Sequence, residues 1–358
     1  MNLPRLWPSA SGGILPMPVR KTILFLCLFR LLCLSGAAAA EPLEEEVFVL
    51  HLACMYPEDH PVQRRVLRPW AAELARLSEG RLLIRLYPPK SLVPEKEQAQ
   101  AVRLGSLDMG HAPLSAAPAI FPLNQALGLD LELKNPLNAQ AAFWRVYAEL
   151  PEIRNEFGGI KILALHARQP YDLYMFQDGI YGADDLEDKR LLADASPAAL
   201  GLIHLGADAL PQLSRQTTDT LRSKADGALL TADQAAFASL RDFRQIALAG
   251  LPGGACWLGM HQGLWDALPP DLRKILAENS GLELSLALEQ ALREAARAEL
   301  QRLKEAVPEI HYLSAQEREK LRLLTRQPLL DLWMEHAQQT GLSNPRALYD
   351  KIRRIVHK

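Results

Sequence analysis

The chain has 358 residues, of which 49% are hydrophobic, 23% charged and 6% aromatic. This composition is typical of a folded globular protein and excludes a disordered chain, a collagen-like chain and a disulfide-rich miniprotein. Four of the 40 Lys and Arg residues lie in residues 1–40, whereas all 42 Asp and Glu residues follow them. The rest of the chain therefore has a net charge of about −6, which argues against a nucleic-acid partner held by a basic surface.

Residues 1–40 have the pattern of an export signal. A basic stretch precedes an apolar run over 23–32, and four alanines follow, ending at Ala40. Positive charge, apolar run and small residues in this order are typical of a secretory signal peptide. A membrane anchor is the alternative, but Arg30 splits an apolar segment already shorter than the ~20 residues that span a bilayer. We therefore expect cleavage after Ala40 and a location outside the cytoplasm.

Two of the four cysteines remain after the predicted cleavage. Cys27 and Cys33 lie in the signal, whereas Cys54 and Cys256 lie in the exported chain. An oxidising compartment permits a disulfide between them. The alternative is two small buried thiols. The sequence leaves both possibilities open.

Strands and helices alternate in the first half of the chain. Strands are expected at 47–54, 81–87 and 107–111, with helices at 62–77 and 94–105 between them. The helical stretches carry apolar residues three and four positions apart, and the strand at 81–87 alternates apolar and polar residues. This order predicts a largely parallel sheet covered by helices.

A second unit of the same kind follows, and the chain ends in helices. Its elements are expected at 160–165, 190–193 and 198–205, and the helical tail runs from residue 269 onward. Pro328 lies inside the helical stretch 315–339, where we expect a break or kink. The predicted fold is thus α/β with two lobes, an architecture that closes around a ligand because lobe interfaces are favoured binding sites.

Motifs of catalysis are sparse. The chain has no His-Glu-x-x-His or Cys-x-x-Cys spacing, no glycine-rich phosphate loop after a strand and no Gly-x-Ser-x-Gly elbow. The trio at 58–60 is predicted to be a solvated turn, and His111 and His261 are predicted to be structural. We therefore expect no metal, no cofactor and no enzyme activity.

A series of short motifs, specific in its order and spacing, carries a resemblance to a known family. The motifs are Pro57-Glu58-Asp59-His60-Pro61, Glu79-Gly80-Arg81, Tyr87-Pro88, Leu104-Gly105-Ser106-Leu107-Asp108-Met109, Asp185-Leu186, Asp226-Gly227, the run over 264–272, and Tyr312-Leu313-Ser314. With them, residues 46–350 resemble the periplasmic solute-binding subunit of tripartite ATP-independent periplasmic (TRAP) transporters, of the dicarboxylate-binding type.

The resemblance implies two lobes joined by a hinge, a long helix bridging both, and a ligand trapped between them for delivery to a membrane permease. The predicted divisions are a signal peptide at 1–40, lobe one at 41–168 plus 257–296, and lobe two with the C-terminal helices at 169–256 plus 297–358. The exported protein is expected in the periplasm.

The chain departs from the family where the family holds its substrate. Counted from Asp185-Leu186, the family's first substrate-binding arginine falls on Leu192, and its second, in a Gly-Phe-Arg-Asn context, falls on Tyr171. The polar Gln-Glu-Asn that follows the family's Asp-Gly step falls on Ala228, Leu229 and Leu230. A carboxylate stripped of water needs a charged partner, and losing that partner costs about 2–5 kcal/mol. We therefore predict a neutral or substantially hydrophobic ligand in contact with these leucines.

A displaced arginine is the alternative, and it would restore organic-acid binding. Arg190 lies two residues before Leu192 and faces the same side of a strand. Arg168 lies three residues before Tyr171, near the expected hinge.

Other candidate ligand contacts come from a loop and from aromatic side chains. Asp130 lies where the family has an apolar lining segment, and a buried acid there would pair with a cationic or hydroxyl group. Tyr171 and Trp257 could form flat walls with a polar edge. A solvated loop and ordinary core packing are the respective alternatives.

The predicted partners are the TRAP membrane permease subunits and, for an apolar ligand, a tetratricopeptide-repeat periplasmic protein. Two other functions remain open. One is a ligand or lipid carrier that is not coupled to a permease. The other, far weaker, is an enzyme that uses Asp130 or Glu132 as a base, because no nucleophile or metal accompanies them.

Overall fold

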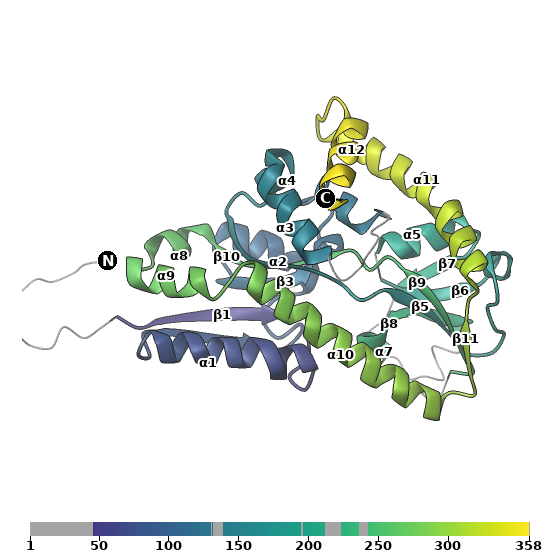
Figure 1. Cartoon of the computed structure of the whole chain (residues 1–358), viewed down its shortest axis with the longest axis horizontal. Coiled ribbons are helices and arrows are strands. Elements are labelled where there is room, and N and C mark those ends of the chain that lie inside the picture. The colour runs from purple at the N-terminus through teal and green to yellow at the C-terminus, as the bar shows by residue number, and fades with distance from the viewer. Residues whose placement is uncertain are drawn as a thin grey trace, which may run out of the picture. The chain divides into compact units, whose positions relative to one another are not determined.

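Two β-sheets with helices packed on both faces organise the chain (Figure 1). The computed structural model describes residues 46–129, 131, 139–194, 196–211, 223–235 and 243–357. Residues 46–358 form one compact unit, whereas the predicted export signal at 1–40 lies outside the described residues. The predicted α/β fold with two lobes is confirmed.

The first sheet has the strand order β2-β1-β3-β10-β4 within the described residues. Its strands are β1 (Phe48–Cys54), β2 (Leu82–Tyr87), β3 (Met109–Pro113), β4 (Ile160–Ala167) and β10 (Ala255–His261). β1 is parallel to β2 and β3, as the alternation of strands and helices predicts, but β10 is antiparallel to β3 and β4. The sheet is mixed rather than largely parallel because β10 enters it from the second lobe.

Each face of the first sheet has its own apolar core. The helices and turns of this lobe are η1 (Gln63–Leu67), α1 (Arg68–Leu77), α2 (Glu95–Leu104), η2 (Leu114–Ala116), η3 (Asn124–Gly128), α3 (Ala139–Glu149), α4 (Pro151–Asn155), α8 (Gln262–Ala267) and α9 (Pro270–Glu278). Leu52 and Cys54 of β1 pack in one core with α1 and α9, whereas Ala53 packs in the other with α2 and α3. This alternation is the period of a strand that is buried on both sides.

The second sheet has the order β11-β9-β5-β8-β6-β7 in the described part of the chain. Its strands are β5 (Tyr171–Met175), β6 (Arg190–Ala193), β7 (Asp208–Pro211), β8 (Gly227–Thr231), β9 (Gln245–Leu251) and β11 (Glu309–Tyr312), with η5 (Ala183–Leu186) and α7 (Ala232–Ala235) in their connections. One face packs on α5 (Pro197–His204) and α11 (Ala315–Gln339), and the other on α10 (Leu282–Ala306). Both faces are therefore apolar.

The backbone passes between the sheets in two short segments and a long helix. Residues 168–170 join β4 to β5, and residues 252–254 join β9 to β10. The Arg168 amide donates to the Gly254 carbonyl at 2.9 Å, so the two segments lie side by side. α10 contacts β4 of the first sheet and β11 of the second, which makes it the bridging helix that the family resemblance implies (Figure 1).

The C-terminal helix α12 (Pro345–Val356) packs beside the first sheet. Tyr349 and Ile352 share a core with Phe143 of α3. From the sequence, residues 297–358 are predicted to belong to lobe two. α12 instead packs beside the first sheet, because its apolar side chains contact α3. The remaining lobe boundaries stay a prediction, with β10 of the first sheet beginning at Ala255.

Pro328 lies inside α11, which nevertheless continues unbroken from Ala315 to Gln339. A proline removes one backbone donor from a helix. Leu329, Leu330 and Trp333, directly after it, are buried in the first-sheet core and hold the next turns in place. The expected break is therefore absent.

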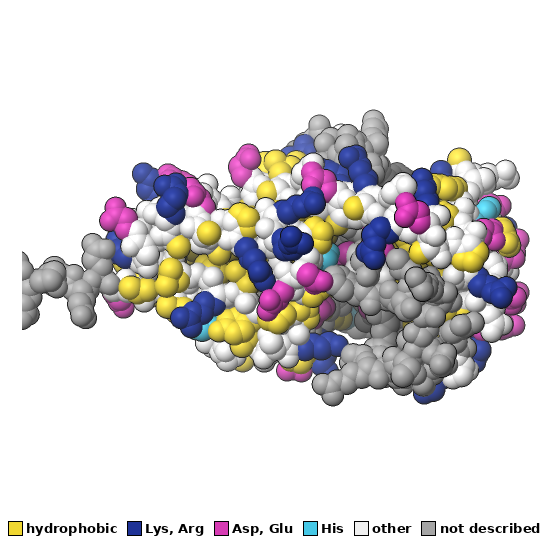
Figure 2. Space-filling model, turned by 90° about the horizontal axis from the view of Figure 1, so that it is seen from below, with side chains coloured by type: hydrophobic (Ala, Val, Ile, Leu, Met, Phe, Trp, Pro, Cys, Tyr) yellow, Lys and Arg dark blue, Asp and Glu magenta, His cyan; other side chains and the backbone are white. Residues whose placement is uncertain are grey.

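None of the described helices is both long and apolar enough to cross a membrane. On the face drawn in Figure 2, Lys and Arg side chains are interspersed with Asp and Glu side chains. The described residues of this face therefore carry charges of both signs rather than a single basic stripe.

Candidate ligand-binding site

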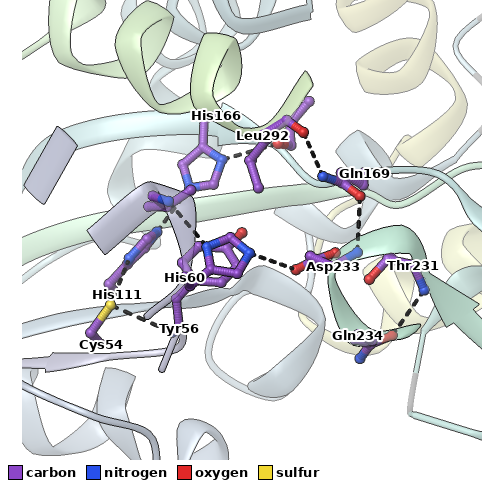
Figure 3. Close-up of polar contacts among 12 residues, drawn as sticks. Cys54, Tyr56, His60, His111, His166, Gln169, Thr231, Asp233, Gln234 and Leu292 are labelled. Atoms are coloured by element: carbon purple, nitrogen blue, oxygen red, sulfur yellow. Dashed lines mark hydrogen bonds and ion pairs between the residues drawn. The ribbon is translucent and has the colours of Figure 1, made fainter. Parts of the chain in front are cut away.

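Polar side chains gather between the two sheets, at the carboxyl ends of several strands. Cys54 ends β1, Thr231 ends β8, and Asp194 follows β6. Ligands of open α/β sheets bind at these strand ends, where loops rather than core residues meet. Figure 3 shows His60, in the turn after β1, pointing toward Asp233 of α7.

Three buried side chains of lobe one form a continuous hydrogen-bonded chain, here called the inner chain. Cys54 Sγ lies 3.7 Å from His111 Nδ1, and His111 Nε2 lies 2.9 Å from His166 Nε2. His166 Nδ1 lies 3.0 Å from the Ala167 carbonyl, which only accepts. His166 Nδ1 must therefore donate, His111 Nε2 donates to His166, and the Cys54 thiol donates to His111.

The protonation states of the inner chain agree with this direction. Burial raises the pKa of Cys54 to about 12, lowers the pKa of His166 to about 4 and holds the pKa of His111 well below its usual value. The thiol is thus protonated and both imidazoles are neutral at pH 7. Every link of the chain has its partner, as expected for structural residues.

Cys54 and Cys256 are both free and buried. Cys54 lies on β1 and Cys256 on β10, and β3 pairs with both strands. Strands two positions apart are separated by about 9–10 Å, whereas a disulfide needs α-carbons within about 7 Å. The sequence left open a disulfide or two buried thiols, and the structure has the two thiols.

His60 connects lobe one to lobe two. Its ring stacks on Tyr56 with centroids 4.2 Å apart, and its Nδ1 accepts from the Val62 amide at 3.1 Å. Its Nε2 points toward Asp233 of α7, 3.8 Å from Oδ2 (Figure 3). His60 is only 2% exposed, so the solvated turn predicted at 58–60 is wrong for this residue. Sequence reasoning missed the burial because the covering residue, Asp233, lies in the other lobe.

Gln169 ties the crossing segment to two other elements. Its Oε1 accepts from the Asp233 amide at 3.2 Å, and its Nε2 donates to the Leu292 carbonyl of α10 at 2.7 Å. The side chain is 6% exposed. It therefore holds α7 and the bridging helix α10 against the hinge.

Arg168 lies beside Gln169 and carries a buried positive charge. Its Nη1 donates to Asp194 Oδ2 at 2.8 Å and contacts the Tyr171 hydroxyl, which itself donates to Asp194 Oδ2 at 2.6 Å. Burial acts to raise the pKa of Asp194, but the Arg168 guanidinium and the Tyr171 hydroxyl hold it below its usual value. The three side chains form a charge-assisted cluster at the hinge.

Several buried polar atoms of this cluster and its surroundings have no hydrogen-bond partner among the described residues. Besides Asp194 Oδ1 they include Tyr56 Oη, Arg168 Nε, Thr231 Oγ1 and Asp233 Oδ1, and the last four residues are here called the interlobe group. An unsatisfied buried polar group costs about 1–3 kcal/mol, and more when charged. Such atoms at a lobe interface are therefore those that a bound ligand would satisfy.

Electrostatic coupling places these residues close together. Burial raises the pKa of Tyr56, and the Asp233 carboxylate adds to the rise. Burial also raises the pKa of Glu95 on α2, while Arg168 acts to lower it and Asp194 to raise it. The site thus contains one permanent cation, Arg168, among several carboxyl groups.

Of the candidate residues predicted from the sequence, the structure brings Arg168 and Tyr171 together. Leu229 is fully buried in the same core as Tyr171, against α5 and α11. Leu192 and Leu230 point to the opposite face, into the core with Leu303 of α10. All three leucines therefore pack against helices.

The remaining candidates predicted from the sequence are Trp257, Arg190 and Asp130. Trp257 is buried in the first-sheet core beside Phe121, on the opposite side of β10 from Cys256. Arg190 is half-exposed and paired with Asp226 at 3.1 Å. Asp130, like Glu132, lies outside the described residues.

A cavity of about 430 Å³ adjoins the hinge on the side of α3. It is lined mainly by apolar side chains, among them Leu127, Leu129 and Phe143, together with Arg168 and Glu289. Burial raises the pKa of Glu289 to about 7 although Arg293, 2.6 Å away, acts to lower it. The hinge thus borders a mainly apolar cavity on the side of α3.

No group of three or more His, Cys, Asp or Glu side chains in the described ranges is arranged to hold a metal ion. The inner chain contributes only two imidazoles and a thiol, and these bond to one another.

Comparisons with known proteins agree with this geometry. Residues 52–209 match the model of bacterial extracellular solute-binding protein, family 7. The chain is 24% identical over 331 residues to a protein of Comamonas testosteroni described as outer membrane transporter protein TsaT, covering 89% of this chain and 96% of that one.

Solved structures share the fold. A TRAP solute-binding protein of Rhodoferax ferrireducens with copurified benzoate superposes with a TM-score of 0.77 at 21% identity, covering 87% of this chain and 98% of that one. A marine metagenome TRAP solute-binding protein, from an unidentified microbe, holds 3-hydroxybenzoate and has a TM-score of 0.76 at 17% identity, with coverages of 87% and 98%. The family model matches less than half of the chain, and the solved structures show that the chain has the same fold as these TRAP solute-binding proteins.

Proposed function

We propose that this protein binds a small organic acid with an apolar body in the periplasm and delivers it to the membrane subunits of a TRAP transporter. The observation that carries the proposal is the buried guanidinium of Arg168 at the lobe interface. Its side chain is 6% exposed, and Nε has no partner in the described part of the chain. Asp194 pairs with Nη1, but a buried guanidinium edge without a partner favours a ligand group that accepts a hydrogen bond, such as a carboxylate.

The guanidinium has room for a second carboxylate. Asp194 occupies Nη1, which leaves the Nε edge for the ligand. The hydroxyls of Tyr56 and Thr231 are further donors without a partner in the described ranges. Arg168 is therefore the displaced arginine considered above, and Arg190 is unsuited because its side chain is 46% exposed and bound to Asp226.

The neutral or hydrophobic ligand predicted from the sequence receives no support. The similar structures described above hold benzoate and 3-hydroxybenzoate, which are acids. The leucines on which that prediction depended are packed against helices. An apolar body with one carboxylate agrees with both observations, since such a ligand needs a single arginine.

The wider assignments belong to the same proposal. Residues 1–40 act as a signal peptide cleaved after Ala40, the ligand lies between the lobes, and the protein performs no catalysis. TRAP permease subunits are the proposed partner. The comparisons give no support to a tetratricopeptide-repeat partner.

Calorimetric titration of the exported protein tests the proposal. Benzoate, 3-hydroxybenzoate, mandelate and succinate are compared with benzamide, which keeps the ring and lacks the charge. At least one aromatic acid should bind, and benzamide should bind more than thirtyfold more weakly, because the loss of a buried charge pair costs about 2–5 kcal/mol.

Arg168→Met should abolish binding of the acid, and Arg190→Met serves as the matched control that retains it. Circular dichroism checks that each variant is folded, and Arg168→Lys, which keeps the charge for Asp194, is the second variant. Equal binding of benzamide and benzoate, or full binding by folded Arg168→Met, would overturn the proposal.

A further inference from the structure

The interlobe group holds more acceptors than a simple carboxylic acid can satisfy. Asp233 is 9% exposed, and its Oδ1 has no partner within the described residues. Its Oδ2 lies 3.8 Å from His60 Nε2, which is longer than a hydrogen bond. A carboxylate ligand offers acceptors alone and leaves Asp233 unsatisfied.

The charges of the site lead to the same conclusion. Arg168 is already neutralised by Asp194 at 2.8 Å. The Asp233 carboxylate is a second negative charge, and it is close enough to act on Tyr56, Arg168 and Glu95. A ligand carboxylate adds another negative charge and offers Asp233 no hydrogen, whereas a hydroxyl or amino group on the ligand would donate to Asp233 and offset part of the cost of burying its carboxylate.

We infer that the ligand is an organic acid that also carries a hydroxyl or amino group, and that Asp233 Oδ1 accepts a hydrogen bond from that group. This inference rests on the proposed function, with Arg168 as the carboxylate partner. Asp233 is then the residue that selects organic acids with a hydroxyl or amino substituent over their unsubstituted analogues. A site built to accept such a donor rejects an analogue that lacks it, because the buried acceptor is left unpaired.

The backbone gives Asp233 a fixed position for this role. Its amide donates to Gln169 Oε1, and Gln169 also bonds to α10, so the residue is tied to the hinge. Thr231, two residues earlier, bonds through its amide to Gln234 Oε1 at 3.0 Å. These contacts hold the turn between β8 and α7 while leaving Asp233 Oδ1 and Thr231 Oγ1 for the ligand (Figure 3).

The test is a comparison of matched ligands on the intact exported protein. Benzoate is titrated beside 2-, 3- and 4-hydroxybenzoate and 3-aminobenzoate, and phenylacetate beside mandelate. The best substituted acid should bind about 10- to 100-fold more tightly than its unsubstituted analogue, the range expected for a hydrogen bond to a buried charge. In Asp233→Ala this ratio should fall to about one while the unsubstituted acid binds at least as well as before.

Asp226→Ala removes a carboxylate of the same lobe that is paired with Arg190, and it should keep the wild-type ratio. Equal affinities for all members of a pair in the wild type, or an unchanged ratio in Asp233→Ala, would overturn the inference while leaving the proposed function intact. Failure of every acid to bind the wild type would overturn both. If Asp233→Ala does not fold, Asp233→Asn is the second variant, because it keeps an acceptor without the charge. It should reduce the preference for 3-aminobenzoate over benzoate more than the preference for the hydroxybenzoates over benzoate.

Discussion

Two groups of buried polar side chains lie between the sheets, and they differ in how their hydrogen bonds are completed; Figure 3 shows the first group together with Tyr56, Thr231 and Asp233 of the second. The inner chain, Cys54, His111 and His166, ends on a backbone carbonyl, and each link has a partner. The interlobe group keeps four polar atoms without a described partner. Burial alone therefore does not separate structure from binding, whereas the state of the hydrogen bonds does. In this pair of groups, the completed bonds agree with a structural role and the incomplete ones with a ligand-binding role.

The largest expected effect concerns a residue on the structural side of this comparison. Leu229→Ala should reduce the free energy of unfolding by about 3–5 kcal/mol, because a fully buried leucine is replaced with a cavity. Its effect on ligand affinity should be less than twofold, because the side chain packs against α5 and α11. Urea unfolding and calorimetry measure the two quantities. A large loss of affinity in a folded variant would return Leu229 to the ligand contacts.

The pair of Arg168 and Asp194 shares a feature with each group, because Arg168 belongs to the interlobe group while its bond to Asp194 is complete. Asp194→Ala leaves the guanidinium buried without its partner and should cost about 3 kcal/mol of stability. Asp226→Ala breaks the half-exposed pair with Arg190 and should leave the melting temperature unchanged, because exposed pairs contribute little. Differential scanning calorimetry of both variants makes the comparison. Equal losses would show that the hinge pair is not buried as described.

The inner chain predicts a loss of stability in acid. Burial holds the pKa of His166 near 4, below the usual 6.5, so the native state excludes a proton that the unfolded chain takes up. The stabilisation is complete above pH 6.5 and is lost as pH falls from 6.5 to 4, by roughly 3 kcal/mol. His166→Gln should flatten this slope in denaturant titrations at several pH values. An unchanged slope would assign the acid sensitivity to other groups.

The smallest effect compares one substitution at two tyrosines. Tyr171→Phe removes a hydroxyl that donates to Asp194 at 2.6 Å and should cost about 1.5–3 kcal/mol. Tyr56→Phe removes a hydroxyl without a partner in the described chain and should change the stability of the ligand-free protein by less than about 0.5 kcal/mol. In titrations with the acid, Tyr56→Phe should lose more affinity than Tyr171→Phe. The opposite order in the ligand-free protein would remove Tyr56 from the interlobe group.

The sequence predicts the architecture well because its signals are local. Alternating strand and helix patterns locate β1, β2 and β4, and family motifs locate the strands that carry Leu192 and Leu229. The faces of those strands could not be predicted, because both sides of the second sheet are covered by helices that come from distant segments. Periodicity identifies a buried strand without saying which core each side chain enters.

The site is only partly predictable for a related reason. Arg168 stands out as a cation near the expected hinge, but Asp194, Asp233 and Gln169 do not, since their partners lie in other segments of the chain. An acidic residue after a strand has the same local signature whether it is solvated or buried. His60 illustrates the error, because its turn is polar in sequence and yet the other lobe covers it.

The most direct measurement is a crystal structure of the exported protein with the acid that binds most tightly in the titrations. We expect a ligand carboxylate oxygen within hydrogen-bond distance of Arg168 Nε and a ligand hydroxyl or amino group at Asp233 Oδ1, both between the two sheets. A ligand bound between the lobes with its carboxylate on another cation, such as Arg293, and with Arg168 paired only to Asp194, would contradict it.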